Sequence, residues 1–308
     1  MIQVKELKKC FGSLRAVDGL SFSVSPGEVL GFLGPNGAGK STTMKMLTGF
    51  LTPSSGEVTV FGINVTRNPM EAQKQIGYLP EGAPAYGDMS VLGFLKFIGE
   101  IRGFKGDELS ARVDAVVRQV ALQGVLHQRI ETLSKGFKRR VGLAQAIIHD
   151  PQVLILDEPT DGLDPNQKHQ VRELIKNLSK EKIVIVSTHI LEEVHAVCTR
   201  AMIIAAGKLV ADGKPEELAA LSDYHQAITL RFTESCDAEP LLQGLPGVAS
   251  VKVEEDRKTL TVYPEHGQSI LKSVNLLIHE QDWGLEEFHV ERGRLDDVFR
   301  KVTQEVTE

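Results

Sequence analysis

The stretch Gly34 to Thr42, which reads GPNGAGKST, constrains the fold of this chain more than any other. It fits the pattern G-x-x-x-x-G-K-[ST] and follows an apolar run, Val29 to Leu33, that predicts a buried strand. The residues from Thr43 onward predict a helix, so the stretch has the strand-to-helix context that a phosphate-binding loop requires. The alternative is a Gly-rich turn with an exposed lysine. Chance brings the four fixed positions together in roughly one chain in a hundred of this length.

Several residue types in this stretch have a physical reason to contact a phosphate. Its glycines let backbone N–H groups turn toward an anion with no Cβ in the way, and the positive end of the following helix faces the same point. Lys40 is expected to reach the β and γ phosphates, and the Ser41 hydroxyl to hold Mg²⁺. The nucleotide-binding residues expected here are Gly34, Pro35, Asn36, Gly37, Ala38, Gly39, Lys40, Ser41 and Thr42.

Length and composition narrow the class of protein further. A chain of 308 residues is long enough for two domains, and its net charge of −6 argues against a general nucleic-acid binder. Its three cysteines, Cys10, Cys198 and Cys236, are widely spaced and predict neither a disulfide framework nor a metal site. No apolar stretch approaches the roughly 20 residues needed to cross a bilayer. If the protein works at a membrane, we expect another chain to span it.

Two apolar runs end in polar residues that suit an active site. Val153 to Leu156 leads into Asp157 and Glu158, and Ile183 to Val186 leads toward His189. Both runs predict central parallel strands, and ligands of such sheets lie beyond the carboxyl ends of the strands. We expect Asp157 to hold Mg²⁺, Glu158 to orient or deprotonate a water, and His189 to hydrogen-bond the γ-phosphate or that water. Acidic turn residues and an ordinary histidine are the alternatives.

A helical insert is expected between residues 82 and 150. Ser90 to Arg102 and Asp107 to Val120 carry helical spacing, and LSKGF, Leu133 to Phe137, opens a further periodic helix with Ser134 as its N-cap. The basic residues Lys138 to Arg140 are expected on the solvated face of that helix. A short strand, Ile76 to Leu79, precedes the insert and ends in Pro80-Glu81.

With these stretches in order, residues 2 to about 221 resemble the ATP-binding subunit of an ABC transporter. The resemblance rests on Phe11 at the adenine-stacking position, GPNGAGKST, LSKGF at the signature position, VLILDEP, DGLDP at the loop that crosses to a partner subunit (Asp161 to Pro165), and His189. Read alone, Phe11 is better explained as a packing residue. Six stretches in the family's order make the resemblance specific.

The resemblance implies a fold, a reaction and partners. The fold is an α/β P-loop NTPase core with a helical subdomain, in residues 1 to 221, and the reaction is hydrolysis of ATP with Mg²⁺. Two chains would face head to tail, so that Ser134, Gly136 and Asp164 of one chain contact the ATP held by the other. This homodimer would drive transport, with export favoured, through a separate permease and would lie on the cytoplasmic face of the membrane.

Two departures from the family's pattern indicate the subclass of ABC transporter subunit. The family usually has Gln where this chain has Glu81, which we expect among the Mg²⁺ ligands with Ser41 and Asp157. The signature is commonly LSGGQ, whereas Lys135 and Phe137 stand here. Both departures resemble subunits that serve ABC-2 type permeases. A groove for the permease is expected from five apolar residues that are equally well explained as core: Tyr86, Val91, Phe94, Phe97 and Ile98.

Residues 222 to 308 have a different pattern. Their alternation and periodicity predict the order β-α-β-β-α-β, so we expect a small α+β domain of ferredoxin-like fold with no catalytic constellation. Stabilising the homodimer is the first hypothesis for this domain, and sensing a ligand or regulating hydrolysis is the second.

Two other functions compete with transport. An ABC ATPase acting on nucleic acid or ribosomes is supported only by Lys138 to Arg140, and no nucleic-acid partner is expected. A phosphate-loop kinase for a small molecule leaves LSKGF and DGLDP unexplained.

Overall fold

The computed structural model describes residues 1–265, 267–281 and 283–305. Contacts divide the chain into two compact units, one built on Met1–Lys214 and the other on Pro215–Gln304. Each unit has its own hydrophobic core, and each is described separately below.

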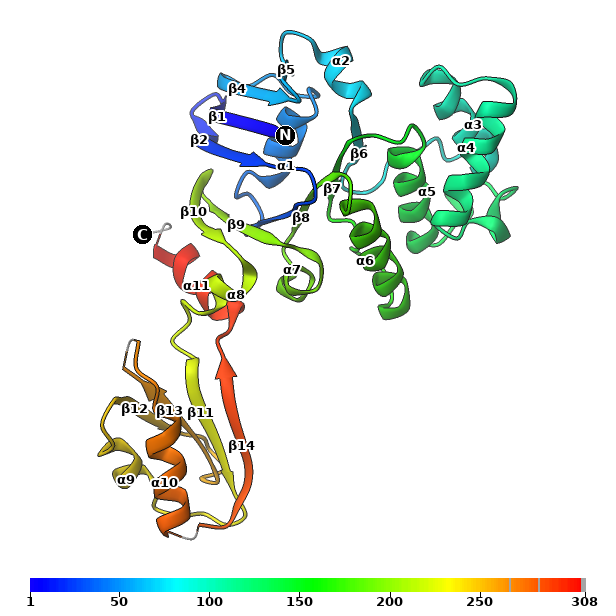
Figure 1. Cartoon of the computed structure of the whole chain (residues 1–308). Coiled ribbons are helices and arrows are strands. Elements are labelled where there is room, and N and C mark those ends of the chain that lie inside the picture. The colour runs from blue at the N-terminus through cyan, green and yellow to red at the C-terminus, as the bar shows by residue number, and fades with distance from the viewer. Residues whose placement is uncertain (266, 282, 306–308) are drawn as a thin grey trace. The chain divides into compact units, whose positions relative to one another are not determined.

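The first unit is organised around a six-stranded sheet with the strand order β10-β9-β3-β8-β7-β6 (Figure 1). Neighbouring strands from β9 to β6 are parallel, and β10 pairs antiparallel with β9 at one edge. Every residue of β3, β7 and β8 is buried, which agrees with the continuous apolar runs of a sheet covered on both faces. The strands are β3 Val29–Leu33, β6 Ile76–Leu79, β7 Val153–Asp157, β8 Ile183–Thr188, β9 Arg200–Ala205 and β10 Lys208–Gly213.

A second, antiparallel sheet of the same unit has the order β2-β1-β4-β5. Helix α1 (Lys40–Leu47) carries buried side chains, Met44 and Leu47 among them, into a core that both sheets share. This packing fixes the start of α1, and therefore the phosphate loop, at the ends of the central strands. The strands are β1 Ile2–Phe11, β2 Leu14–Val24, β4 Ser55–Val60 and β5 Ile63–Asn64.

Helices α3, α4 and α5 gather beside edge strand β6 (Figure 1). Ser90 and Ser134 cap α3 and α5, where their hydroxyls accept hydrogen bonds from the N–H groups of Gly93 and Phe137. The remaining helices of this unit cover the sheet or join its strands. The helices are α2 Pro69–Lys74, α3 Val91–Ile101, α4 Gly106–Gln119, α5 Lys135–Ile147, α6 Pro165–Ser179 and α7 Leu191–Val197, with short 3₁₀ turns at Gln123–Val125 and Ile130–Thr132.

Of the two hypotheses for the five apolar residues, permease groove or core, the core hypothesis holds for two of them. Val91 and Phe94 are 0% and 2% exposed and lie in the core that α3, α4 and α5 share. Tyr86 packs edge-on against Phe94 and Phe97 and keeps 57% of its surface exposed. Helical spacing could not distinguish a groove from a core. Residues three or four apart share one face whether that face meets solvent or a neighbouring helix.

The second unit contains a four-stranded antiparallel sheet of order β12-β13-β11-β14. The chain order β-α-β-β-α-β and this strand order define a ferredoxin-like domain, as predicted. Helices α9 and α10 cover one face, where Ile228, Leu230, Phe232 and Val274 are buried. The elements are α8 Pro215–Ala219, β11 His225–Phe232, α9 Glu239–Gln243, β12 Val248–Val253, β13 Thr259–Pro264, α10 Leu271–Gln281, β14 Leu285–Arg292 and α11 Leu295–Glu305.

Candidate nucleotide site

The loop between β3 and α1 has the backbone of an anion cradle. Gly37 and Gly39 adopt φ angles of +82° and +99°, and Gly39 is the N-cap of α1. A Cβ at Gly39 would collide with the carbonyl oxygen of Ala16 on β2, whereas a Cβ at Gly37 would meet nothing within 4 Å. The loop therefore packs against the protein at Gly39 and stays open at Gly37, where its N–H groups can surround a phosphate.

Lys40 lies inside this loop. Its ammonium donates hydrogen bonds to the carbonyl oxygens of Gly34 (2.7 Å) and Pro35 (3.2 Å), and the residue is only 6% exposed. Burial lowers the pKa of Lys40, while the carboxylates of Glu158 and Asp157 act in the opposite direction. The structure therefore holds a cation at the place where the motif predicts a contact with phosphate.

Asp157, the last residue of β7, is 1% exposed, and its two carboxylate oxygens differ in their hydrogen bonding. The Ser187 hydroxyl on β8 donates to Oδ1. Oδ2 is buried and has no hydrogen-bond partner among the described residues. A buried carboxylate oxygen without a partner is costly, which suits an atom that receives a ligand.

Ser41, Glu81 and Asp157 line one cleft of about 1020 Å³. A serine hydroxyl and one or two carboxylates are typical protein ligands for Mg²⁺ bound together with phosphate. No three Asp, Glu, His or Cys side chains cluster for a metal in the described part of the chain.

Glu158 and His189 form a second pair of interacting polar residues in the candidate site. Nδ1 of His189 lies 2.9 Å from Oε1 of Glu158, whose side chain is 12% exposed. Burial raises the pKa of Glu158, and the hydrogen bond from His189 partly opposes this shift. Glu158 also adopts a φ of +51°, a left-handed conformation uncommon for residues other than glycine. The pair thus supplies a carboxylate of raised basicity beside a proton-bearing ring.

Ser134, Gly136 and Asp164 lie together at the N-termini of α5 and α6. Asp164 caps α6 by accepting from the N–H of Gln167 (2.9 Å), and the Gln167 side chain lies directly over Gly136. Helix α5 packs on β6, α3 and α4, whereas α1 packs on β2 and β7. The three residues therefore lie on other elements than the phosphate loop, and none of them lines the cleft that contains Ser41.

Phe11 ends β1, and its ring is 49% exposed with the Lys9 ammonium 5.3 Å from the ring centre. Phe11 pairs with Leu14 across the β1–β2 hairpin, and two residues further on Ala16 contacts Gly39 of the phosphate loop. The aromatic face is therefore near the loop and accessible to a planar ring.

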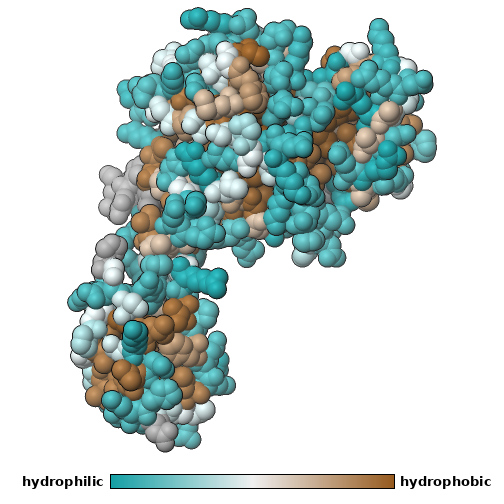
Figure 2. All heavy atoms as spheres, viewed as in Figure 1, coloured by the Kyte–Doolittle hydropathy of each residue, from teal (hydrophilic) through white to brown (hydrophobic). Residues whose placement is uncertain are grey.

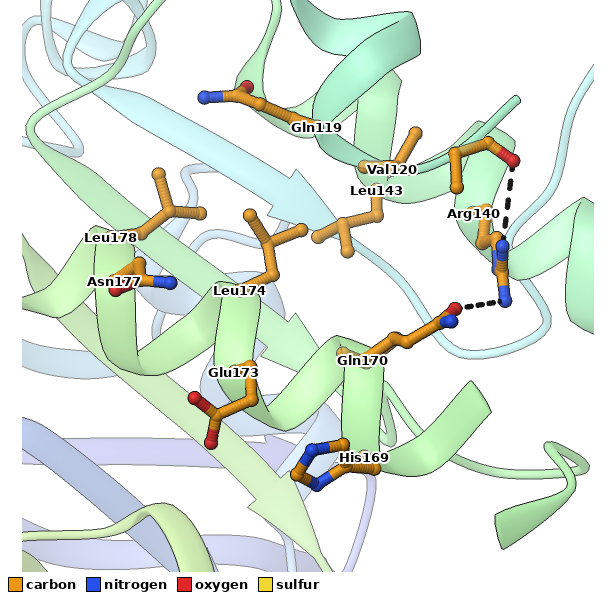
Figure 3. A pocket seen from close by; sticks show the side chains of 12 residues that line it. Gln119, Val120, Arg140, Leu143, His169, Gln170, Glu173, Leu174, Asn177 and Leu178 are labelled. Atoms are coloured by element: carbon orange, nitrogen blue, oxygen red, sulfur yellow. Dashed lines mark hydrogen bonds between the residues drawn. The ribbon is translucent and has the colours of Figure 1, made fainter. Parts of the chain in front are cut away.

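The prediction that Lys138 to Arg140 lie on a solvated face is wrong for Arg139 and Arg140, which are 5% and 9% exposed. Arg139 donates to the carbonyl oxygens of Glu158 and Pro80. Arg140 donates to Gln170 Oε1 (2.7 Å) and Ala121 O (3.5 Å), at the edge of a cavity of about 610 Å³ between α4, α5 and α6 (Figure 3). Because α5 is surrounded on most sides, its arginines bind backbone and side-chain oxygens. Two of the three basic residues on which the nucleic-acid hypothesis rests are therefore buried.

Sequence reasoning gave no role to three polar residues of this region. Ser187 binds Asp157, Arg139 binds the backbone of Glu158, and the Tyr78 hydroxyl is buried near both carboxylates of the cleft. The position of Ser187 at a strand end could have indicated its role in the site. The other two depend on how β6 and α5 pack, which no local pattern reveals.

A phosphate loop beside a buried acidic strand end defines a P-loop nucleoside triphosphatase, and comparison with known proteins specifies the family. The family model described as "ABC transporter" matches residues 17–161. The chain is 33% identical over 304 residues to the Nod factor export ATP-binding protein I of Cupriavidus metallidurans, covering 98% of this chain and 97% of that protein. It is 32% identical over 305 residues to the linearmycin resistance ATP-binding protein LnrL of Bacillus subtilis, covering 98% of each. The chain belongs to the ATP-binding proteins of ABC transporters, which are ATPases.

Solved structures agree on the fold. The chain superimposes on an ATP-binding subunit of an ABC transporter with a TM-score of 0.66 at 28% identity, covering 71% of this chain and 91% of that one. The cassette MJ0796, solved as a post-hydrolysis dimer bound to ADP and Pi, gives the same TM-score at 22% identity, covering 70% and 99%. The predicted fold class and ATPase class are confirmed. No helix in the described residues is long and apolar enough to span a membrane.

Proposed function

We propose that two copies of this chain enclose two ATP molecules head to tail and drive export through a separate membrane permease. The observation that carries the proposal is that the predicted nucleotide contacts lie on two different sets of elements within one chain. The phosphate loop and the acidic strand end form one group, and the N-termini of α5 and α6 form the other. A helix N-terminus attracts anions. A two-fold rotation that places the first group of one chain against the second group of the other chain produces two identical sites.

Within one chain, the phosphate loop binds the triphosphate and Lys40 neutralises its β and γ groups. Ser41, Asp157 and Glu81 would hold Mg²⁺, and the bound ion would supply positive charge to the phosphates. Glu158 accepts a proton from the attacking water or orients it, and His189 holds Glu158 in place and contacts the γ-phosphate. Phe11 stacks on the adenine.

The partner chain completes each site. Ser134 presents a hydroxyl, Gly136 an N–H group and Asp164 a loop carboxylate, all at helix N-termini. ATP closes the dimer because both chains bind its γ-phosphate, and hydrolysis removes the shared group. A state-dependent affinity of this kind can move a permease between two conformations.

The permease is proposed to be of the ABC-2 type, and the chain is proposed to lie on the cytoplasmic face of the membrane by binding it. Relatives that align along nearly the whole chain are named for Nod factor export and linearmycin resistance, which favours export. Glu81 and the LSKGF signature point to the same subclass.

The C-terminal domain, residues 222 to 308, is proposed to stabilise the dimer. Figure 2 shows apolar side chains on the surface of this unit, and Leu241, Leu271 and Leu276 on α9 and α10 are 47%, 42% and 63% exposed. Exposed apolar side chains on adjacent helices suit contact with another protein surface.

Glu158→Gln tests the proposed chemistry. The variant should bind ATP as the wild type does but release phosphate at least about a hundredfold more slowly, because general-base catalysis contributes factors of this size. Glu181→Gln, at an exposed position before β8, is the matched control and should leave the rate unchanged. A Glu158→Gln variant with the wild-type rate would contradict the assigned role.

A further inference from the structure

Tyr78 occupies a strand position next to the acidic end of β7. It pairs with Ile155 in the parallel ladder between β6 and β7. Side chains two residues apart on a strand share a face, so Tyr78 lies on the same face of the sheet as Ile155 and Asp157. Tyr78 also lines the cleft that contains Ser41, Glu81 and Asp157.

The Tyr78 hydroxyl is buried and has no hydrogen-bond partner among the described residues, and the same is true of Asp157 Oδ2. A buried hydroxyl normally finds a partner, and leaving one unpaired costs about 1–3 kcal/mol. The unpaired hydroxyl therefore indicates a partner that Tyr78 gains when the cleft is occupied.

The electrostatics of the cleft make the hydroxyl a donor. Burial and the negative charges of Asp157 and Glu81 raise the pKa of Tyr78, so the phenol keeps its proton. A phenol O–H beside two carboxylates gains most by donating to one of them, since hydrogen bonds to charged groups are the stronger kind.

We propose that Tyr78 is a positioning residue for the divalent cation, and that its hydroxyl, which is unpaired in this structure, donates to the Glu81 carboxylate when the cation is bound and holds it toward the ion. Glu81 follows β6 by two residues and is exposed, so it lacks the fixed setting that Ser187 gives to Asp157. Two carboxylates that converge on one cation repel each other, and a donor on one of them reduces that repulsion. This inference rests on the proposed Mg²⁺ site.

A double-mutant cycle on the full chain tests it, with Mn²⁺ as the probe. The affinity for Mn²⁺ is measured by electron paramagnetic resonance in the presence of a non-hydrolysable ATP analogue, in wild type, Tyr78→Phe, Glu81→Ala and the double variant. We expect Tyr78→Phe to weaken Mn²⁺ binding roughly 3- to 10-fold, the worth of one hydrogen bond. The double variant should bind like Glu81→Ala alone, because the hydroxyl acts through that carboxylate.

The matched control is Tyr86→Phe, whose ring packs on α3 outside this cleft, and it should bind Mn²⁺ as the wild type does. Wild-type affinity in Tyr78→Phe, or additive losses in the double variant, would overturn the role of Tyr78 and leave the cation site intact. Failure of the wild type to bind Mn²⁺ with the analogue would instead remove the cation site itself, and the role of Tyr78 with it.

Discussion

Nδ1 of His189 lies 2.9 Å from Oε1 of Glu158, although 31 positions separate the two residues in the sequence. Strands β7 and β8 are neighbours in the sheet, so their carboxyl ends bring the pair together. Burial raises the pKa of Glu158, and His189 works against this shift. The histidine therefore keeps the carboxylate ionised at lower pH than burial alone would allow.

This relationship predicts a shift in the pH profile. A general base must be deprotonated, so the rate falls as the pH drops through the pKa of Glu158. His189→Ala removes the hydrogen bond that lowers this pKa, and the acidic limb of kcat should move to higher pH, with a lower plateau. His195→Ala, on α7, is the control. An acidic limb that stays in place or moves to lower pH would refute the assignment.

Lys40→Ala should weaken ATP binding roughly 10- to 150-fold. The substitution removes a buried ammonium whose contacts with phosphate are each worth about 1.5–3 kcal/mol. Titration with a fluorescent ATP analogue measures the loss, and Lys96→Ala, at an exposed position of α3 outside the cleft that contains Ser41, is the matched control. Equal losses in both variants would mean that only the general positive charge of the protein matters.

Gly39→Ala and Gly37→Ala should differ in their effect on stability. Both positions require a positive φ, which costs other residues about 1–2 kcal/mol. Only at Gly39 would the added Cβ also collide with Ala16. Calorimetry should therefore show a small fall in the melting temperature for Gly37→Ala and a much larger one for Gly39→Ala. Equal falls would show that β2 moves away easily.

Much of the candidate site could be predicted because its residues lie where local sequence patterns change. The phosphate loop, Asp157, Glu158 and His189 each follow an apolar run, and the ends of parallel strands meet at one edge of the sheet. The strands β6, β7 and β8 were predicted within two residues of their observed ends for the same reason. The alternation of apolar and polar residues in the last 87 residues likewise predicted the ferredoxin-like order of strands and helices.

The rest depends on packing between distant elements. Arg139 and Arg140 belong to a basic triplet that resembles a solvated helix face, and only the surrounding β6, α4 and α6 show that they are buried. The helical spacing of Val91 and Phe94 is compatible with a groove and with a core. The unpaired hydroxyl of Tyr78 follows from strand register, which the sequence of β6 does not contain.

Arg172 and Glu193 form an ion pair between α6 and α7, and breaking it should destabilise the first unit. Their side chains are 23% and 4% exposed and lie 3.6 Å apart. Removing one partner leaves a buried charge uncompensated at a cost of about 3–5 kcal/mol, so Arg172→Met should lower the melting temperature by roughly 6–20 °C. Replacing both, as Arg172→Met with Glu193→Leu, should recover most of the loss. A double variant as unstable as the single one would contradict this.

In the proposed dimer, each ATP is bound by two chains. Sedimentation of Glu158→Gln with saturating ATP and Mg²⁺ measures whether ATP joins the chains. We predict a dimer that requires ATP, that is weakened by a second substitution, Ser134→Ala, and that is unaffected by Ser110→Ala on α4. A Glu158→Gln chain that binds ATP yet sediments as a monomer at every protein concentration would contradict the claim.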